Sequence, residues 1–129
     1  MDYNVESKDG ITVIALNEPH LDQALTATLK AELLILTSQD DGPLIIDLSN
    51  VATCDSDGLA ALLMAQRMLN DAGRALKISG SNAEFKKLLR ISQLAGMFEL
   101  YATVRAARAS CGPKRKSTTA TRVVKSPKA

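Results

Sequence analysis

The segment that most constrains the fold is residues 44–63, with the sequence LIIDLSNVATCDSDGLAALL. It begins as a short apolar run, passes through a polar segment ending in Asp55, Ser56, Asp57 and Gly58, and continues with leucines at helical spacing. This pattern predicts a strand, a loop and a helix. The loop would place a serine hydroxyl between two carboxylates at the helix N-terminus, where free N–H groups and the helix dipole favour negative charge.

The segments on either side alternate between strand and helix patterns. Residues 2–7 and 11–16 have strand character and are separated by Asp9 and Gly10, a turn pair typical of β-hairpins. Leucines recur every three or four residues from Leu21 and predict a helix that ends before Asp41. The remaining elements are predicted as a strand at 44–48, a helix after the Asp-Ser-Asp-Gly loop that ends at 71–73, a strand at 75–79, a helix from Ser81 or Asn82 to Arg90, an edge strand at 97–101 and one or two helical turns at 104–109.

This order of elements predicts a single α/β domain, with a mixed sheet of four to five strands packed against three to four helices. The strand at residues 44–48 is almost uniformly apolar, so we expect it at the centre of the sheet with both faces covered. A helix connects it to the strand at 75–79, which predicts that the two strands are parallel. Loops at the carboxyl ends of such strands commonly meet ligands and partners, and the loop that contains Ser56 lies at such an end.

Charge divides the chain into two parts. Residues 1–104 carry 8 Lys and Arg against 14 Asp and Glu, whereas residues 105–129 carry 8 Lys and Arg and no acid. From Ser110 onward the sequence offers little to bury, which predicts a domain at residues 1–109 and a basic, disordered tail at 110–129. The tail contains no aromatic residue for base stacking, so we do not expect nucleic acid as a partner. Its basic charge nevertheless leaves contact with nucleic acid, an acidic membrane or the acidic body of the protein open.

No apolar run is long enough to span a bilayer, and the N-terminus lacks the features of a secretory signal. We therefore expect a cytoplasmic protein without membrane insertion. Cys54 and Cys111 give neither a disulfide framework nor a metal-ligand spacing, and His20 is the single histidine. We expect reduced thiols, no metal and no cofactor.

An acidic loop that contains a glycine admits several interpretations. A calcium-binding loop with Gly58 at position six would have Thr53 at position one and no acid at position twelve, so two of the strongest ligands are missing. A phosphotransferase of the haloacid-dehalogenase kind would need an apolar strand running directly into Asp55 and a later adjacent acidic pair, and both are missing. Two interpretations stay open: Asp55 or Ser56 is the N-cap of the helix, or Ser56 is a regulated phosphoacceptor.

Three motifs, taken together, point to a family. They are Asp47, Leu48 and Ser49 at the end of a strand, then Asp55, Ser56, Asp57, Gly58 and Leu59, and then Leu94 through Phe98. With these motifs, the chain over residues 3–105 resembles the STAS domain of bacterial anti-sigma-factor antagonists. Leu21, Asp22 and Thr26 are similar to the segment that opens the first helix of that family.

The resemblance implies a switch in partner binding, without catalysis by the domain itself. The unphosphorylated protein would bind an anti-sigma factor that is also a serine kinase, and so free a sigma factor for transcription. The kinase would phosphorylate Ser56 and a separate serine phosphatase would restore it. The partner-binding residues that the resemblance implies are Asp22, Asp55, Ser56, Asp57, Gly58 and Leu59.

One departure from the family motif and one alternative function leave this interpretation open. The family's second loop serine is replaced by Asp57, which puts a fixed charge beside the acceptor. The same fold class also serves as a non-switching scaffold or adaptor subunit, in signalling assemblies or in a lipid-transport complex. For such a subunit, phosphate turnover at Ser56 would be incidental.

Overall fold

A mixed β-sheet of six strands forms the centre of the protein in the computed structural model, which describes residues 1–39, 42–111 and 120–124. Along the sheet the strands follow the order β7-β6-β4-β2-β1-β8. Strands β2, β4, β6 and β7 are mutually parallel, and β1 is antiparallel to both of its neighbours. The bounds of the strands are Tyr3–Lys8 for β1, Ile11–Leu16 for β2, Leu44–Asp47 for β4, Leu76–Ser79 for β6, Glu99–Tyr101 for β7 and Ala120–Val124 for β8.

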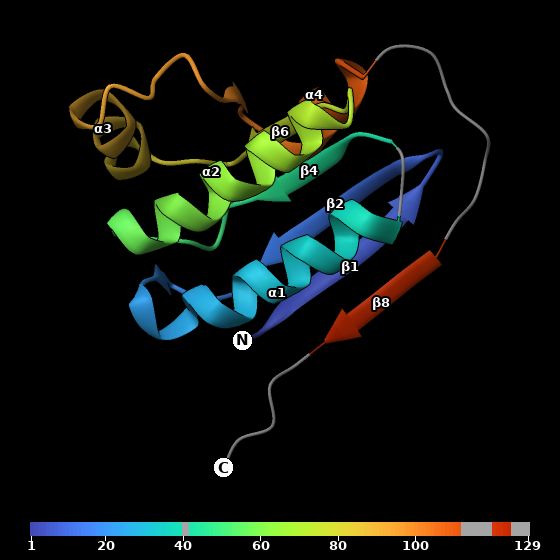
Figure 1. Ribbon diagram of the computed structural model, residues 1–129, viewed down its shortest axis with the longest axis horizontal. Helices are drawn as coiled ribbons and strands as arrows, with labels where there is room; N and C mark the ends of the chain where they lie inside the picture. The colour runs from blue at the N-terminus through green and yellow to red at the C-terminus, as the bar shows by residue number, and fades with distance from the viewer. Residues whose placement is uncertain (40–41, 112–119, 125–129) are drawn as a thin grey trace.

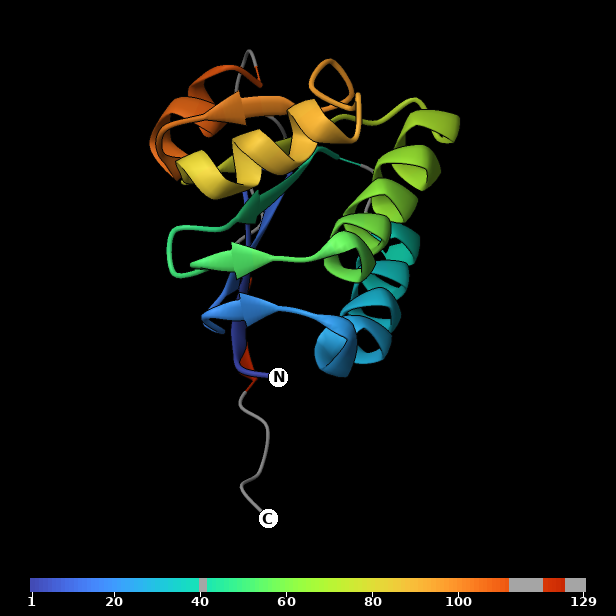
Figure 2. The same ribbon diagram turned by 90° about the vertical axis from the view of Figure 1, so that its left-hand side faces the viewer.

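Helices cover both faces of this sheet (Figure 1). Helices α1 (Gln23–Gln39) and α2 (Ser56–Asp71) pack side by side on one face, as the view in Figure 2 also shows. The short helix α4 (Val104–Ala109) packs on the other face, where Ala107 meets Ile45 of β4. Helix α3 (Ala83–Ile91) follows β6 and contributes two buried side chains.

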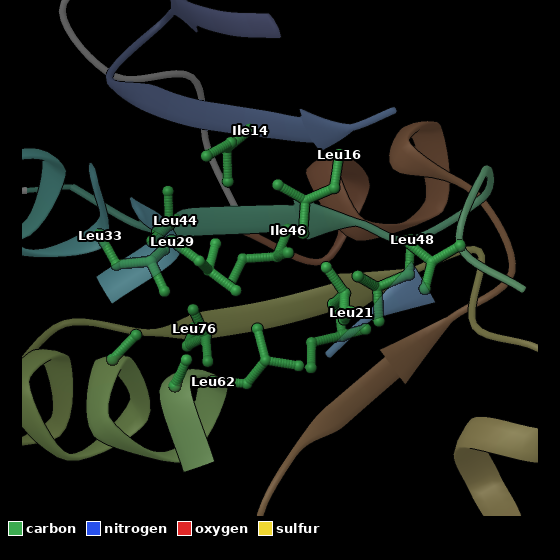
Figure 3. Close-up of a cluster of buried hydrophobic side chains, with 14 of the residues drawn as sticks. Ile14, Leu16, Leu21, Leu29, Leu33, Leu44, Ile46, Leu48, Leu62 and Leu76 are labelled. Carbon is green, nitrogen blue, oxygen red and sulfur yellow. The ribbon is translucent and has the colours of Figure 1, made fainter. Parts of the chain in front are cut away.

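The main core lies between the sheet and the pair α1 and α2 (Figure 3). Ile14, Ile46 and Ile78 occupy neighbouring positions on three adjacent strands, and all three are fully buried. Leu29 and Leu33 of α1 face them from one helix, and leucines of α2 face them from the other. Strand β4 is therefore central and covered on both faces, as its apolar sequence predicts.

Most of the predicted elements are confirmed, including the parallel pairing of β4 with β6. The hairpin turn is confirmed by its backbone, because Asp9 and Gly10 have φ angles of 55° and 77°, as a type I′ turn requires. Sequence patterns missed two strands of two residues each, β3 (His20–Leu21) and β5 (Thr53–Cys54), which pair in parallel. The first helix consequently begins at Gln23 rather than at Leu21.

One segment of the predicted tail from Ser110 onward is a strand in the structure. Ala120–Val124 forms β8, whose backbone pairs antiparallel with β1 and extends the sheet beyond the predicted four to five strands. Pairing with a free sheet edge satisfies backbone groups. Thr121, Val123 and Val124 are β-branched and favour a strand, a local signal that the polar composition of the whole tail hides. The rest of the predicted tail, at 112–119 and 125–129, lies outside the described residues.

Candidate functional site

The pair of short strands brings the N-termini of α1 and α2 together at the carboxyl end of the sheet. Figure 2 shows β3 and β5 as parallel arrows, one leading into each helix. In this pair Leu21 lies opposite Cys54, and the backbone N–H of Asp55 donates to the carbonyl of Leu21 over 3.0 Å. Asp22 and Asp55 directly follow these paired residues, so both aspartates lie at the same edge of the molecule.

Asp55 is the N-cap of α2. Its backbone is extended, and its Oδ1 accepts a hydrogen bond of 2.9 Å from the N–H of Gly58. This geometry satisfies one of the free N–H groups of the first turn. The Asp-Ser-Asp-Gly segment, predicted as a loop, is therefore the cap and first turn of the helix, which begins at Ser56.

Ser56 and Asp57 are the exposed residues of that first turn. Among the residues that the structure describes, neither side chain has a hydrogen-bond or ion-pair partner. Both groups project at the positive end of the helix dipole, which favours negative charge. The serine hydroxyl and the second carboxylate are therefore available to a partner, whereas the carboxylate of Asp55 is already engaged.

Gly58 and Leu59 are buried beneath this turn. A Cβ atom added at Gly58 would lie 2.6 Å from the carbonyl oxygen of Leu21 and 3.0 Å from the Sγ of Cys54. Leu59 is 4% exposed and belongs to the main core. These two residues hold the turn against β3 from inside, and their direct contact with a partner stays a prediction.

Asp22 has a role in α1 similar to that of Asp55 in α2. Its Oδ1 accepts a hydrogen bond of 3.0 Å from the N–H of Ala24, and its carbonyl accepts one of 3.0 Å from the hydroxyl of Thr26. The sequence resemblance alone suggested that Asp22 belongs with the Ser56 region. The structure brings the two N-termini together, while partner binding by Asp22 stays a prediction.

Three side chains that were not assigned to the site hold its surroundings in place. The Nδ1 of His20 and the hydroxyl of Thr53 are hydrogen-bonded at 2.6 Å, which links β3 to β5 on the surface. Asn82, predicted as a possible cap of α3, accepts from the N–H of Phe85 and also donates to the carbonyl of Ala52 over 2.9 Å. The helix-cap pattern could identify the first of these Asn82 contacts but carries no signal for the second.

Asp47, the discordant charge in an apolar strand, ends β4. Its Oδ1 accepts hydrogen bonds of 3.0 Å from the N–H of Ser49 and 2.5 Å from the Ser49 hydroxyl. These bonds form the turn that leaves the sheet toward β5. The first of the three resemblance motifs therefore has a structural role in positioning the segment before Ser56.

Cys54 is a packing residue beside the site and lies against the main core. Burial, together with the negative charge of Asp55, raises the pKa of its thiol to about 12. A thiol with such a pKa is protonated at neutral pH and is a poor nucleophile. Cys54 therefore contributes volume and an apolar surface to this region rather than covalent chemistry.

Neither a metal centre nor a membrane span emerges from the described part of the chain. Within residues 1–39, 42–111 and 120–124, no three His, Cys, Asp or Glu side chains come together as a possible metal site. No helix in those ranges is both long and apolar enough to cross a bilayer. The carboxylates of Asp22 and Asp55 are committed to helix caps instead.

Comparison with known proteins identifies relatives of this arrangement. Residues 4–101 match a family model described as "Mlab, STAS domain". No curated protein matches the chain. The matched region runs from β1 through β7 and includes both helix N-termini.

Several solved structures have a similar fold, and three of them are described below. An anti-sigma-factor antagonist (STAS) domain protein from Planctomyces limnophilus superposes with a TM-score of 0.77 and 14% identity, covering 86% of this chain and 98% of that one. An anti-sigma factor antagonist from Mycobacterium paratuberculosis gives 0.74 and 22%, covering 84% and 92%. The Bacillus cell fate determinant SpoIIAA in its phosphorylated form gives 0.66 and 20%, covering 84% and 97%. Such identities show a shared fold.

Proposed function

The chain belongs to the STAS-domain family, and we propose that it is an anti-sigma-factor antagonist switched off by phosphorylation of Ser56. Its partner would be an anti-sigma factor with serine kinase activity, acting in the bacterial cytoplasm, and a serine phosphatase would reverse the modification. The observation that carries the proposal is the Ser56 hydroxyl, exposed in the first turn of α2 and without a partner among the described side chains.

The charge of the surroundings supports a switch at this position. A phosphate would add about 1.5 to 2 negative charges next to Asp57, on a surface that already has the carboxylate of Asp55. The helix N-terminus would partly accommodate the phosphate, so α2 itself need not unfold. A partner surface that fits the unmodified turn would meet a group that is larger and much more negative.

The surroundings of Ser56 also support a role as substrate rather than catalyst. Activation of a serine nucleophile requires a neighbouring base such as histidine. The ring of His20 is hydrogen-bonded to Thr53, on the adjoining strand. We therefore assign the phosphoryl transfer to the partner kinase.

Two variants of Ser56 test the switch. We expect Ser56→Ala to keep partner binding, because it removes only a small hydroxyl, and Ser56→Glu to weaken it by at least tenfold, because it adds a fixed charge. Each purified protein is first used to capture partners from the native cell. The affinity of the captured kinase is then measured by titration with wild type, Ser56→Ala and Ser56→Glu in turn. Intact mass after incubation of wild type with that kinase and ATP should show one added phosphate, located at Ser56 by peptide mapping.

Ser110→Glu is the matched control, since Ser110 is an exposed serine at the end of α4, on the opposite face of the sheet from α2. It should bind the kinase as wild type does. Equal affinity of wild type and Ser56→Glu, with no phosphate gained, would contradict the switch.

The fixed charge of Asp57 favours a second candidate function. A residue that is permanently negative beside the acceptor suits a partner with a compensating cation, whatever the state of Ser56. In that case the chain is a non-switching scaffold or adaptor subunit of a signalling assembly or a lipid-transport complex. Stable capture of the same partners by Ser56→Ala, Ser56→Glu and wild type would support this second candidate.

A further inference from the structure

Helix α1 exposes apolar residues on its outer face, in addition to those on the face it buries. Leu34 and Ile35 are 51% and 42% exposed, although both are large hydrophobic residues. Ala24, Ala27 and Ala31 precede them at helical spacing and are exposed as well. Gln23, Thr28, Lys30 and Ser38 are the exposed polar residues among the α1 side chains that the structure describes, so the exposed surface is mixed, with an apolar stripe through these five positions. We call the five apolar residues the outer α1 face.

The exposed surface of α1 has fewer charged residues than the exposed surfaces of α2 and α3. Of the α1 side chains that the structure describes, Lys30 is the one exposed charge, and Glu32 is 6% exposed. In contrast, α2 and α3 each expose several charged residues. These are Asp57, Arg67 and Asp71 on α2 and Glu84, Lys86, Lys87 and Arg90 on α3. A contiguous exposed apolar face marks an interaction surface.

We propose that the outer α1 face binds the same face of a second copy of this chain, with the two helices antiparallel. The alanines occupy the face from residue 24 to residue 31, and the large residues Leu34 and Ile35 occupy its C-terminal end. Ala24 and Ile35 are eleven residues apart, which is roughly 16 Å along a helix. In an antiparallel pair, Leu34 and Ile35 of each copy lie over the alanines of the other, and the small residues allow close approach.

Self-complementarity favours a second copy over the partner that recognises Ser56. A two-fold interface requires that one patch fit itself, and large residues at one end with small residues at the other meet that requirement. The first turn of α2 lies beside the N-terminus of α1, whereas Leu34 and Ile35 lie roughly 17 Å farther along α1. In the antiparallel pair, Leu34 and Ile35 of the second copy reach Ala24, so the dimer would place the second copy beside each Ser56 turn.

The size of the face predicts a weak dimer. Helix α1 has 17 residues, which corresponds to a length of about 25 Å. One helix face of that length buries less than the roughly 1,200 Å² of a standard stable interface. We expect reversible association that depends on protein concentration.

Sedimentation equilibrium of the full chain over a hundredfold concentration range, on the order of micromolar to sub-millimolar, tests the proposal. Wild type should show a monomer–dimer equilibrium, and Ile35→Glu should weaken it at least tenfold, because a carboxylate would face the apolar partner helix. Ile91→Glu is the matched control: Ile91 is 70% exposed on α3 and should tolerate the same change without effect. A monomeric wild type, or equal effects of the two variants, would overturn the proposal.

A charge-pair rescue tests the antiparallel arrangement. Ala24→Glu and Ile35→Lys should each weaken the dimer, whereas the two changes in one chain should restore association toward wild type. In the antiparallel pair the introduced carboxylate of one copy faces the introduced ammonium of the other. The two positions are too far apart to pair within one helix. Circular dichroism should report the same helix content for every variant, and a double variant no stronger than the single ones would rule this arrangement out.

Discussion

The N-termini of α1 and α2 are built alike, yet they present different chemistry. Each helix follows a two-residue strand and an aspartate whose carboxylate accepts from a backbone N–H of the first turn, Ala24 in α1 and Gly58 in α2. The first turn of α1 contains no acid, whereas that of α2 contains Asp57 and an uncommitted serine. A capping carboxylate is therefore shared structure, and the free groups after it distinguish the candidate site.

Gly58 should give the largest effect, because it has no equivalent at the start of α1. The third residue after Asp22 is Leu25, whereas the third after Asp55 is Gly58, packed on the carbonyl of Leu21. We expect Gly58→Ala to lower the free energy of unfolding by about 1 to 3 kcal/mol, because the added methyl group meets backbone that cannot move away cheaply. Urea denaturation followed by circular dichroism measures the change.

Gly96→Ala is the control for that substitution. An added Cβ at Gly96 meets no atom within 4 Å, so we expect a change within about 0.5 kcal/mol. If Gly58→Ala were as harmless as Gly96→Ala, the close contact between the two N-termini would not be essential to the fold.

Removing the two caps should have the next largest effect. Asp22→Ala and Asp55→Ala should each lower the free energy of unfolding by about 1 kcal/mol, because each leaves a first-turn N–H without its acceptor. The loss at Asp22 should be the greater by a few tenths, since Asp57 still provides a favourable charge to α2. Thermal and urea unfolding of the two variants compare them directly.

Asparagine at the same positions separates capping from charge. Asp22→Asn and Asp55→Asn keep a side-chain oxygen acceptor, so both should be more stable than the alanine variants. Alanine variants as stable as wild type would mean that the two carboxylates do not cap their helices.

Local patterns predict most of the fold because most elements are long enough to show a period. The apolar run of β4 and the leucine spacing of α2 identify both elements and place Ser56 between two carboxylates. In contrast, β3 and β5 have two residues each, too few for any period. Strand β8 has β-branched residues that favour a strand, but it pairs with a strand more than a hundred residues earlier, and its own sequence does not identify that partner.

The candidate site likewise has residues that the sequence identifies and contacts that it does not. Asp55 and Ser56 stand out in the sequence by charge and by their place before a helix. The contact of His20 with Thr53 joins residues 33 apart, and that of Asn82 with Ala52 joins residues 30 apart. Such contacts arise when β3, β5 and α3 come together, so single-sequence patterns carry no signal for them.

The smallest expected effect is on the reactivity of the Cys54 thiol, which should respond to the charge of Asp55 and not to that of Asp22. Burial and then the charge of Asp55 raise the pKa of this thiol to about 12, so alkylation at pH 8 should be slow. With Cys111→Ser as background, Asp55→Asn should accelerate alkylation a few-fold, because it removes the second cause and leaves the first. Asp22→Asn should leave the rate unchanged, since Asp22 does not contribute to that pKa shift. Equal acceleration by both variants would mean that the two carboxylates act on Cys54 alike, and the electrostatic difference between the two helix N-termini would not hold.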